Sequence, residues 1–175
     1  MEICAFFKDF HHCPKCGGEF IDNNVKSKRC EECGFVYYFN PSAAVAAIIR
    51  DDSGKILVST RAHDPAKGTL DLPGGFVDSY ESAEQSVVRE VMEECSVEVT
   101  EIKYLFSLPN IYNYSRFNVH TLDLFFECRV ADLSPLKAAD DVASLQLIAP
   151  EDIDTAQFGL DSVRSAMERY LSELL

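Results

Sequence analysis

Three glutamates, Glu90, Glu93 and Glu94, stand three and four residues apart, a spacing that places their carboxylates on one face of a helix. Carboxylates this close repel one another, and divalent cations relieve the repulsion. Mg²⁺ and Mn²⁺ accept such oxygen ligands while leaving room for water and substrate phosphates. Taken by itself, such a trio is more often an ordinary solvated acidic face, and the alternative is a divalent-cation site. The surrounding residues decide between the two.

Two Cys-x-x-Cys pairs offer a second metal chemistry. Cys13 and Cys16 form the first pair, Cys30 and Cys33 the second, and each pair is followed by glycine. This spacing suits one tetrahedral Zn²⁺, and a site filled by four thiolates is structural because it has no open position for water. The alternative is four unrelated buried cysteines. The remaining cysteines are expected to be small buried hydrophobic residues. They are Cys4, Cys95 and Cys128.

The acidic trio lies inside a longer pattern that resembles the Nudix box. That box has glycine, glutamate, Arg-Glu, an aliphatic residue, Glu-Glu, glycine and a second aliphatic residue at fixed spacings. All but one of these positions match here, and the departure is Ser96, which replaces the second glycine just past the helix. A four-cysteine ribbon followed by this box is similar to the NADH pyrophosphatase branch of the family. The matching positions are Gly75, Glu81, Arg89, Glu90, Val91, Glu93, Glu94 and Val97.

The resemblance implies a pyrophosphohydrolase. Such an enzyme cleaves a nucleoside diphosphate linked to another moiety, such as NAD(H) or ADP-ribose, with Mg²⁺ or Mn²⁺ as cofactor. In the family the three glutamates and the carbonyl of the first glycine contact metal, while the arginine and the first glutamate brace the carboxylates. Carried over to this chain, the metal contacts are Gly75, Glu90, Glu93 and Glu94, and the bracing residues are Arg89 and Glu81.

Residues outside the box are candidates for a further metal ligand and for substrate contacts. Asp140 or Asp141 fits the acid that relatives bring from a later loop, and we expect Asp141; the alternative is a surface loop acid. Aromatic rings can stack on a base and guanidinium groups can bind phosphate, although core packing and surface solvation are simpler explanations. The candidates are Phe76 and Tyr112 for stacking, and Arg61 and Arg116 for phosphate.

Hydrophobic periodicity and turn residues predict the elements that must position these side chains. Strands and helices alternate within one short domain, which indicates sheet layers covered by helices, and the resemblance implies a Nudix-type α/β/α sandwich with a mixed sheet. The expected elements are a strand at 43–49, its hairpin partner at 55–60, a Gly/Pro-rich loop at 63–75, strands at 97–108 and 122–130, and an amphipathic helix at 162–174.

The acidic helix is expected at 83–95. Ser82 is its predicted N-cap and Gln85 completes a capping box. The helix also carries an apolar arc beside the acids, which we expect to face the core. This arc consists of Val87, Val88, Val91, Met92 and Cys95.

A domain boundary is expected at Asn40-Pro41. Proline restricts the preceding residue to extended geometry, and a long apolar segment begins directly afterwards. The sequence thus predicts a zinc ribbon over 1–40 and a Nudix hydrolase domain over 41–175.

Charge narrows the choice of partners. The chain carries 16 Lys and Arg against 29 Asp and Glu, a formal net charge of −13. A chain this acidic repels nucleic acid and anionic lipid, so we expect neither nucleic acid nor a membrane as a partner. The resemblance implies a nucleotide-type small molecule as the partner. The start of the sequence lacks a secretory signal pattern, which favours a cytoplasmic protein. The resemblance also implies a homodimer.

A function of a different class is a non-catalytic nucleotide sensor or partner-binding module on the same fold. The retained glutamates argue against it, because a site without turnover would be free to lose such costly charges.

Overall fold

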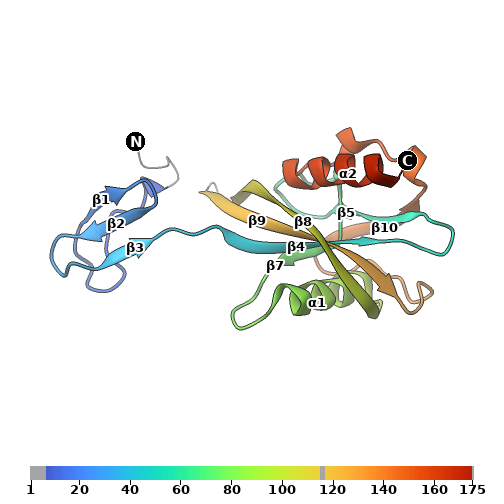
Figure 1. Cartoon of the computed structure of the whole chain (residues 1–175), viewed down its shortest axis with the longest axis horizontal. Coiled ribbons are helices and arrows are strands. Elements are labelled where there is room, and N and C mark those ends of the chain that lie inside the picture. The colour runs from blue at the N-terminus through green and yellow to red at the C-terminus, as the bar shows by residue number, and fades with distance from the viewer. Residues whose placement is uncertain (1–6, 115–116, 175) are drawn as a thin grey trace.

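The computed structural model describes residues 7–114 and 117–174, and it begins with a small antiparallel sheet. This sheet has the order β1-β2-β3 and is joined to the rest of the chain by the segment between β3 and β4 (Figure 1). Two ring contacts also link the two parts, between Phe10 and Phe117 and between Phe7 and His120. The three strands are β1 (Phe20–Asn24), β2 (Ser27–Cys30) and β3 (Val36–Tyr38).

Two sheets and two helices form the larger part of the molecule. The four-stranded sheet has the order β7-β4-β9-β8, and it is mixed because β4 and β9 run parallel while its other pairs are antiparallel. Its strands are β7 (Gly74–Phe76), β4 (Ser42–Ile49), β9 (Phe117–Val130) and β8 (Val99–Tyr114). The three-stranded antiparallel sheet consists of β10 (Val142–Ile148), β5 (Ile56–Arg61) and β6 (Leu70–Asp71). The helices are α1 (Ala83–Cys95) and α2 (Asp161–Leu174). Two short 3-10 turns, Pro150–Asp152 and Thr155–Gln157, precede α2.

The helices cover opposite sides of the sheets, as Figure 1 shows. Strand β4 accounts for this arrangement, because successive side chains of a strand point to opposite faces. Val45, Ala47 and Ile49 belong to the core that contains α1, whereas Ala46 and Ile48 belong to the core that contains α2. The expected mixed α/β/α sandwich is therefore confirmed.

Helix α1 begins and ends as the sequence predicts. Ser82 Oγ accepts from Gln85 N–H at 3.2 Å and Gln85 Oε1 accepts from Ser82 N–H at 2.9 Å, which completes the capping box. Ser96 is left-handed, with φ of 60°. The apolar arc is narrower than expected, because Val88 and Met92 are 38% and 45% exposed. They lie one position beyond the row of side chains that meets β4, so their placement in the core was wrong.

The predicted hairpin between the strands at 43–49 and 55–60, which are β4 and β5, is also wrong. The turn itself forms, with Asp51 N–H donating to the carbonyl of Lys55 at 3.0 Å. However, β4 and β5 lie in different sheets and share one isolated bridge, between Arg50 and Ile56. Each strand finds other partners farther along the chain, because strand pairing is decided by burial of both faces and not by proximity in sequence.

Segments expected to be loops pair with strands. Within 63–75, β6 pairs with β5 and the start of β7 pairs with β4, although elements this short carry no periodic signal. The long hairpin of β8 and β9 also extends well beyond the predicted strands at 97–108 and 122–130. Pro109 is tolerated in β8 because β8 is an edge strand.

The remaining predictions concern the C-terminal helix and the unpaired cysteines. Helix α2 starts one residue earlier than predicted and buries Val163, Met167, Tyr170 and Leu171 as expected. The cysteines Cys95 and Cys128 are buried, and Cys4 lies outside the described residues. In the part of the chain that the structure describes, no helix has the length and apolar character needed to cross a lipid bilayer.

Candidate functional site

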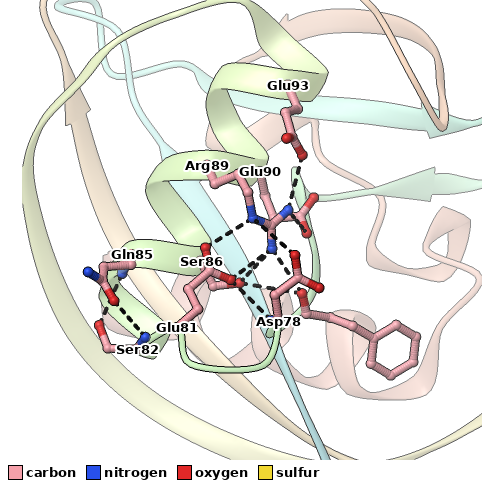
Figure 2. Close-up of polar contacts among 9 residues, drawn as sticks. Asp78, Glu81, Ser82, Gln85, Ser86, Arg89, Glu90 and Glu93 are labelled. Atoms are coloured by element: carbon pink, nitrogen blue, oxygen red, sulfur yellow. Dashed lines mark hydrogen bonds and ion pairs between the residues drawn. The ribbon is translucent and has the colours of Figure 1, made fainter.

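Arg89 lies at the centre of the acidic face of α1 (Figure 2). Its guanidinium donates through Nε and Nη2 to the two carboxylate oxygens of Glu81, both at 3.0 Å. Its Nη1 donates to Glu90 at 2.8 Å and to Glu93 at 3.0 Å. The guanidinium lowers the pKa of Glu81 to about 2. One cation therefore serves three carboxylates and leaves the face negatively charged.

Glu90 and Glu94 are buried, with 8% and 6% of their surface exposed. Glu94 Oε2 accepts a hydrogen bond from Gly74 N–H at 2.9 Å. Burial raises the pKa of Glu94 to about 8, and the charges of Glu90, Asp71 and Asp141 add to the rise. Burial also raises the pKa of Glu90, against the opposing effect of Arg89. Buried carboxylates that are this costly to ionise are suited to a bound cation, because a positive charge would favour the ionised form.

Gly75, the glycine of the box, and Gly74 before it let the backbone approach these carboxylates. A Cβ on Gly75 would lie 2.5 Å from Glu90 Oε1, inside van der Waals contact. A Cβ on Gly74, whose φ is +155°, would lie 2.1 Å from the carbonyl oxygen of Val45. Both positions therefore require glycine, the first for the site and the second for the pairing of β7 with β4.

The loop before β10 lies against α1. The backbone N–H of Ala139 donates to the carbonyl of Glu94 at 3.0 Å. Two acids of this loop raise the pKa values of the buried glutamates, Asp140 that of Glu90 and Asp141 that of Glu94. Asp140 and Asp141 thus lie near enough for their charges to act on the buried glutamates, and Asp141 also lines the adjoining pocket. Metal ligation by Asp141 stays a prediction.

A pocket of about 120 Å³, here called the central pocket, adjoins the acidic face. The predicted contacts Phe76 and Tyr112 line it with their rings perpendicular and centroids 5.6 Å apart. Arg61 donates to Asp71 Oδ2 at 2.5 Å and to the Tyr112 hydroxyl at 3.0 Å. Arg116 lies outside the described residues. The lining comprises Ala44, Val45, Ala46, Ser59, Arg61, Asp71, Leu72, Gly74, Gly75, Phe76, Glu94, Asn110, Tyr112, Thr121, Asp123, Phe125, Asp141, Val142, Leu160 and Val163.

Sequence reasoning missed the buried polar groups of this pocket. Asp71 neutralises Arg61, so that predicted phosphate contact is already paired with a carboxylate. Burial raises the pKa of Asp71, which Arg61 opposes. Asp123 and Thr121 are also buried. An aspartate within the apolar run of β9 was the signal that could have found this cluster, because unpaired charges rarely occupy core strands.

The four paired cysteines gather in the N-terminal part of the chain, where Cys30 ends β2 and the other three lie outside the strands. Their sulfur atoms all lie within 4.8 Å of one another, including Cys16 and Cys30 at 3.5 Å and Cys13 and Cys33 at 3.8 Å. Four sulfurs around a tetrahedral Zn²⁺ at about 2.3 Å would be about 3.8 Å apart. The cluster therefore fits such an ion. Among the described residues, the carboxylates of α1 do not gather around one point in the way the four sulfurs do, because the Arg89 guanidinium lies between Glu90 and Glu93.

Comparison with known proteins identifies the family of the larger part. The family model described as NUDIX domain matches residues 40–170. The chain belongs to the Nudix family. A structure described as a NUDIX hydrolase from Nitrosomonas europaea has a TM-score of 0.72 and 23% identity, covering 93% of this chain and 90% of that one. The NUDIX domain of Shewanella oneidensis NrtR, solved with ADP ribose, has a TM-score of 0.62 and 22% identity, covering 79% and 91%. The Nudix fold is thereby confirmed.

A curated Nudix relative comes from Vibrio atlanticus and is named NAD-capped RNA hydrolase NudC. It is 30% identical over 141 residues, which cover 79% of this chain and 52% of the relative. The chain thus spans about half the length, or less, of the curated relatives it matches.

Proposed function

We propose that this chain is a divalent-cation-dependent Nudix pyrophosphohydrolase. Its substrate is a nucleoside diphosphate linked to another moiety, such as NAD(H) or ADP-ribose, and its products are a nucleoside monophosphate and a phosphorylated second product. The observation that carries the proposal is the burial of Glu90 and Glu94 beside the Gly74-Gly75 backbone, next to the central pocket.

The donor set suits Mg²⁺ or Mn²⁺. Glu90 and Glu94, with the carbonyl of Gly75 and the loop acid Asp141, offer hard oxygen ligands, and Glu93 faces Arg89 at the rim. Bound there, such a cation neutralises phosphate oxygens and lowers the pKa of an attacking water. Arg89 and Glu81 hold the Glu90 carboxylate through the hydrogen bonds already described. Phe76 and Tyr112 flank the substrate, and Arg116 is expected to contact phosphate.

The four-thiolate cluster is proposed to hold a structural Zn²⁺ over the predicted ribbon, residues 1–40. The domain boundary at 40–41, the homodimer and a cytoplasmic location remain predictions.

A screen of the purified full chain tests the proposed activity. Candidate substrates are NADH, NAD, ADP-ribose, dinucleoside polyphosphates and nucleotide sugars, assayed with Mg²⁺ or Mn²⁺ by release of a nucleoside monophosphate. NAD-capped RNA is added because the NudC relative carries that name. Hydrolysis of this RNA would contradict the expectation that nucleic acid is not a partner. The net negative charge of the chain does not exclude such hydrolysis, because only the capped end of the RNA has to reach the site. Release from none of these substrates would favour the non-catalytic module.

The decisive variant is Glu94→Gln. We expect it to abolish cation-dependent hydrolysis while zinc content and the folded structure stay those of the unmodified chain. Glu84→Gln is the matched control, because Glu84 lies in the first turn of the same helix and is exposed. Undiminished turnover in Glu94→Gln would overturn the assignment of this helix.

A further inference from the structure

The central pocket contains a buried polar pair that the hydrolysis of a phosphate bridge does not require. Asp123 and Thr121 stand two residues apart on β9, so their side chains project from the same face of the strand. Asp123 is 8% exposed and Thr121 4%. Both line the same pocket as Glu94 and Gly75, so a single bound molecule could contact this pair and the acidic face together.

The two oxygens of Asp123 differ in their partners. Oδ2 accepts from Ser162 Oγ at 2.5 Å and from Asn110 Nδ2 at 3.1 Å. Oδ1 is buried and has no hydrogen-bond partner among the described residues, and the same holds for the hydroxyl oxygen of Thr121. Ser162 and Asn110 therefore fix the orientation of the carboxylate and leave one acceptor available.

A buried carboxylate oxygen without a donor is costly, so the pocket favours a ligand that supplies one. The carboxylate only accepts hydrogen bonds, whereas the hydroxyl of Thr121 can also donate. Part of the wall is apolar, including Ala46, Phe125 and Val163, and the ion pair of Arg61 with Asp71 also lines the pocket. A partly apolar pocket with an unpaired acceptor beside a hydroxyl donor is complementary to a flat ring bearing an N–H group next to an acceptor nitrogen.

We propose that the central pocket selects an aminated nucleobase, adenine or cytosine, in the substrate. The exocyclic amino group donates to Asp123 Oδ1, and the Thr121 hydroxyl donates to the adjacent ring nitrogen. The inference deepens the proposed function and rests on it only in assuming that the base belongs to the phosphate-bearing substrate. Base selection itself needs neither cation nor turnover.

Nucleosides test this selection without phosphate, added cation or hydrolysis. NMR titration of the full chain compares adenosine with inosine and cytidine with uridine, since each pair differs by an amino group replaced with an oxo group. We expect one aminated nucleoside to bind about tenfold or more tightly than its oxo counterpart, the effect of one hydrogen bond to a charged group. Equal affinity within both pairs, or no binding of any nucleoside, would overturn the proposal.

Asp123→Asn gives a sharper outcome. The two donors at Oδ2 hold the amide oxygen in that place, so the amide nitrogen takes the place of Oδ1. The vacant acceptor becomes a donor, and we expect the preference to invert in favour of the oxo base. An unchanged preference would contradict the assignment of Asp123.

Thr121→Val and Thr121→Ser are a pair of variants that tests the proposal even if Asp123→Asn fails to fold. The valine variant should bind the aminated nucleoside several-fold more weakly and the serine variant should bind it like the unmodified chain. Equal affinities for the two variants would remove Thr121 from the proposal. A chain that hydrolyses nothing but still prefers the aminated base would sink the proposed function and leave this inference standing.

Discussion

Glu94 ties the chemistry of the site to the stability of the fold. It is buried, its carboxylate accepts from Gly74 N–H, and its pKa rises from an ordinary 4.5 to about 8. A carboxylate in this position destabilises the fold when it ionises without a cation, and it is available to a cation for the same reason.

This predicts a pH dependence of stability in the absence of Mg²⁺ and Mn²⁺. Between pH 4.5 and 8 the folded chain keeps the Glu94 proton that the unfolded chain has released. Raising the pH through this range therefore lowers the free energy of unfolding, by at most about 1.4 kcal/mol per pH unit for this proton. Urea unfolding measures it. Glu94→Gln should flatten the slope, and a slope equal to that of the unmodified chain would contradict the assignment.

Gly75→Ala should separate activity from stability. The added Cβ meets the carboxylate of Glu90, which is the far end of a flexible side chain and can move aside. Displacing the Glu90 carboxylate, a proposed metal ligand, by about 1 Å can cost on the order of a hundredfold in rate. We therefore expect such a loss in kcat/KM with little change in thermal unfolding.

Gly74→Ala is the contrasting variant. Its Cβ would meet the Val45 backbone, which cannot move without breaking the pairing of β7 with β4, so the fold itself should be destabilised. Wild-type kcat/KM in Gly75→Ala would count against a role for Glu90.

At the scale of the element, α1 ends in an energetically unfavourable way. Ser96 adopts φ of 60° at the C-cap, a conformation that costs a side-chain-bearing residue about 1–2 kcal/mol. Its backbone N–H still donates to the carbonyl of Met92, so the cap forms despite the strain. The family places glycine here, and the departure affects the turn and not the acidic face.

Ser96→Gly should therefore stabilise the chain by about 0.5–1 kcal/mol, after the extra backbone entropy that glycine loses on folding is taken into account. The difference is measurable as a shift in the urea midpoint. Ser96→Ala is the control, because alanine suffers the same strain. If alanine stabilised the chain as much as glycine, left-handed strain would not be the cause.

At the scale of the whole molecule, the small N-terminal sheet has little apolar core of its own. All residues of β1 and β3 are exposed or half-buried, and the buried members of the four-cysteine cluster are Cys13 and Cys30. Small domains of this kind are commonly stabilised by a structural metal, so the proposed Zn²⁺ should contribute much of the stability of this sheet.

Removal of zinc with a chelator should unfold this sheet and leave the larger part folded. Limited proteolysis with mass spectrometry should then yield a protected fragment that begins near residue 41, and elemental analysis should find about one zinc per chain before chelation. Re-addition of zinc should restore protection. Unchanged proteolysis after zinc loss would contradict a structural role, and light scattering on the same samples tests the homodimer.

The sequence alone determined the features that depend on local spacing. Glu90 and Glu94 share a face because they lie on one helix, and Ser82 and Gln85 cap that helix through hydrogen bonds within one turn. The four cysteines could be grouped because each half of the site is a short loop.

Only the tertiary structure decided which distant segments meet. It paired β4 with β9 and β7 instead of β5, and it placed Arg61 against Asp71. It also brought Asn110 and Ser162 to Asp123, from residues far apart along the chain. Periodicity shows which residues are buried, but the choice among buried partners follows from packing of the whole chain, which short-range patterns do not encode.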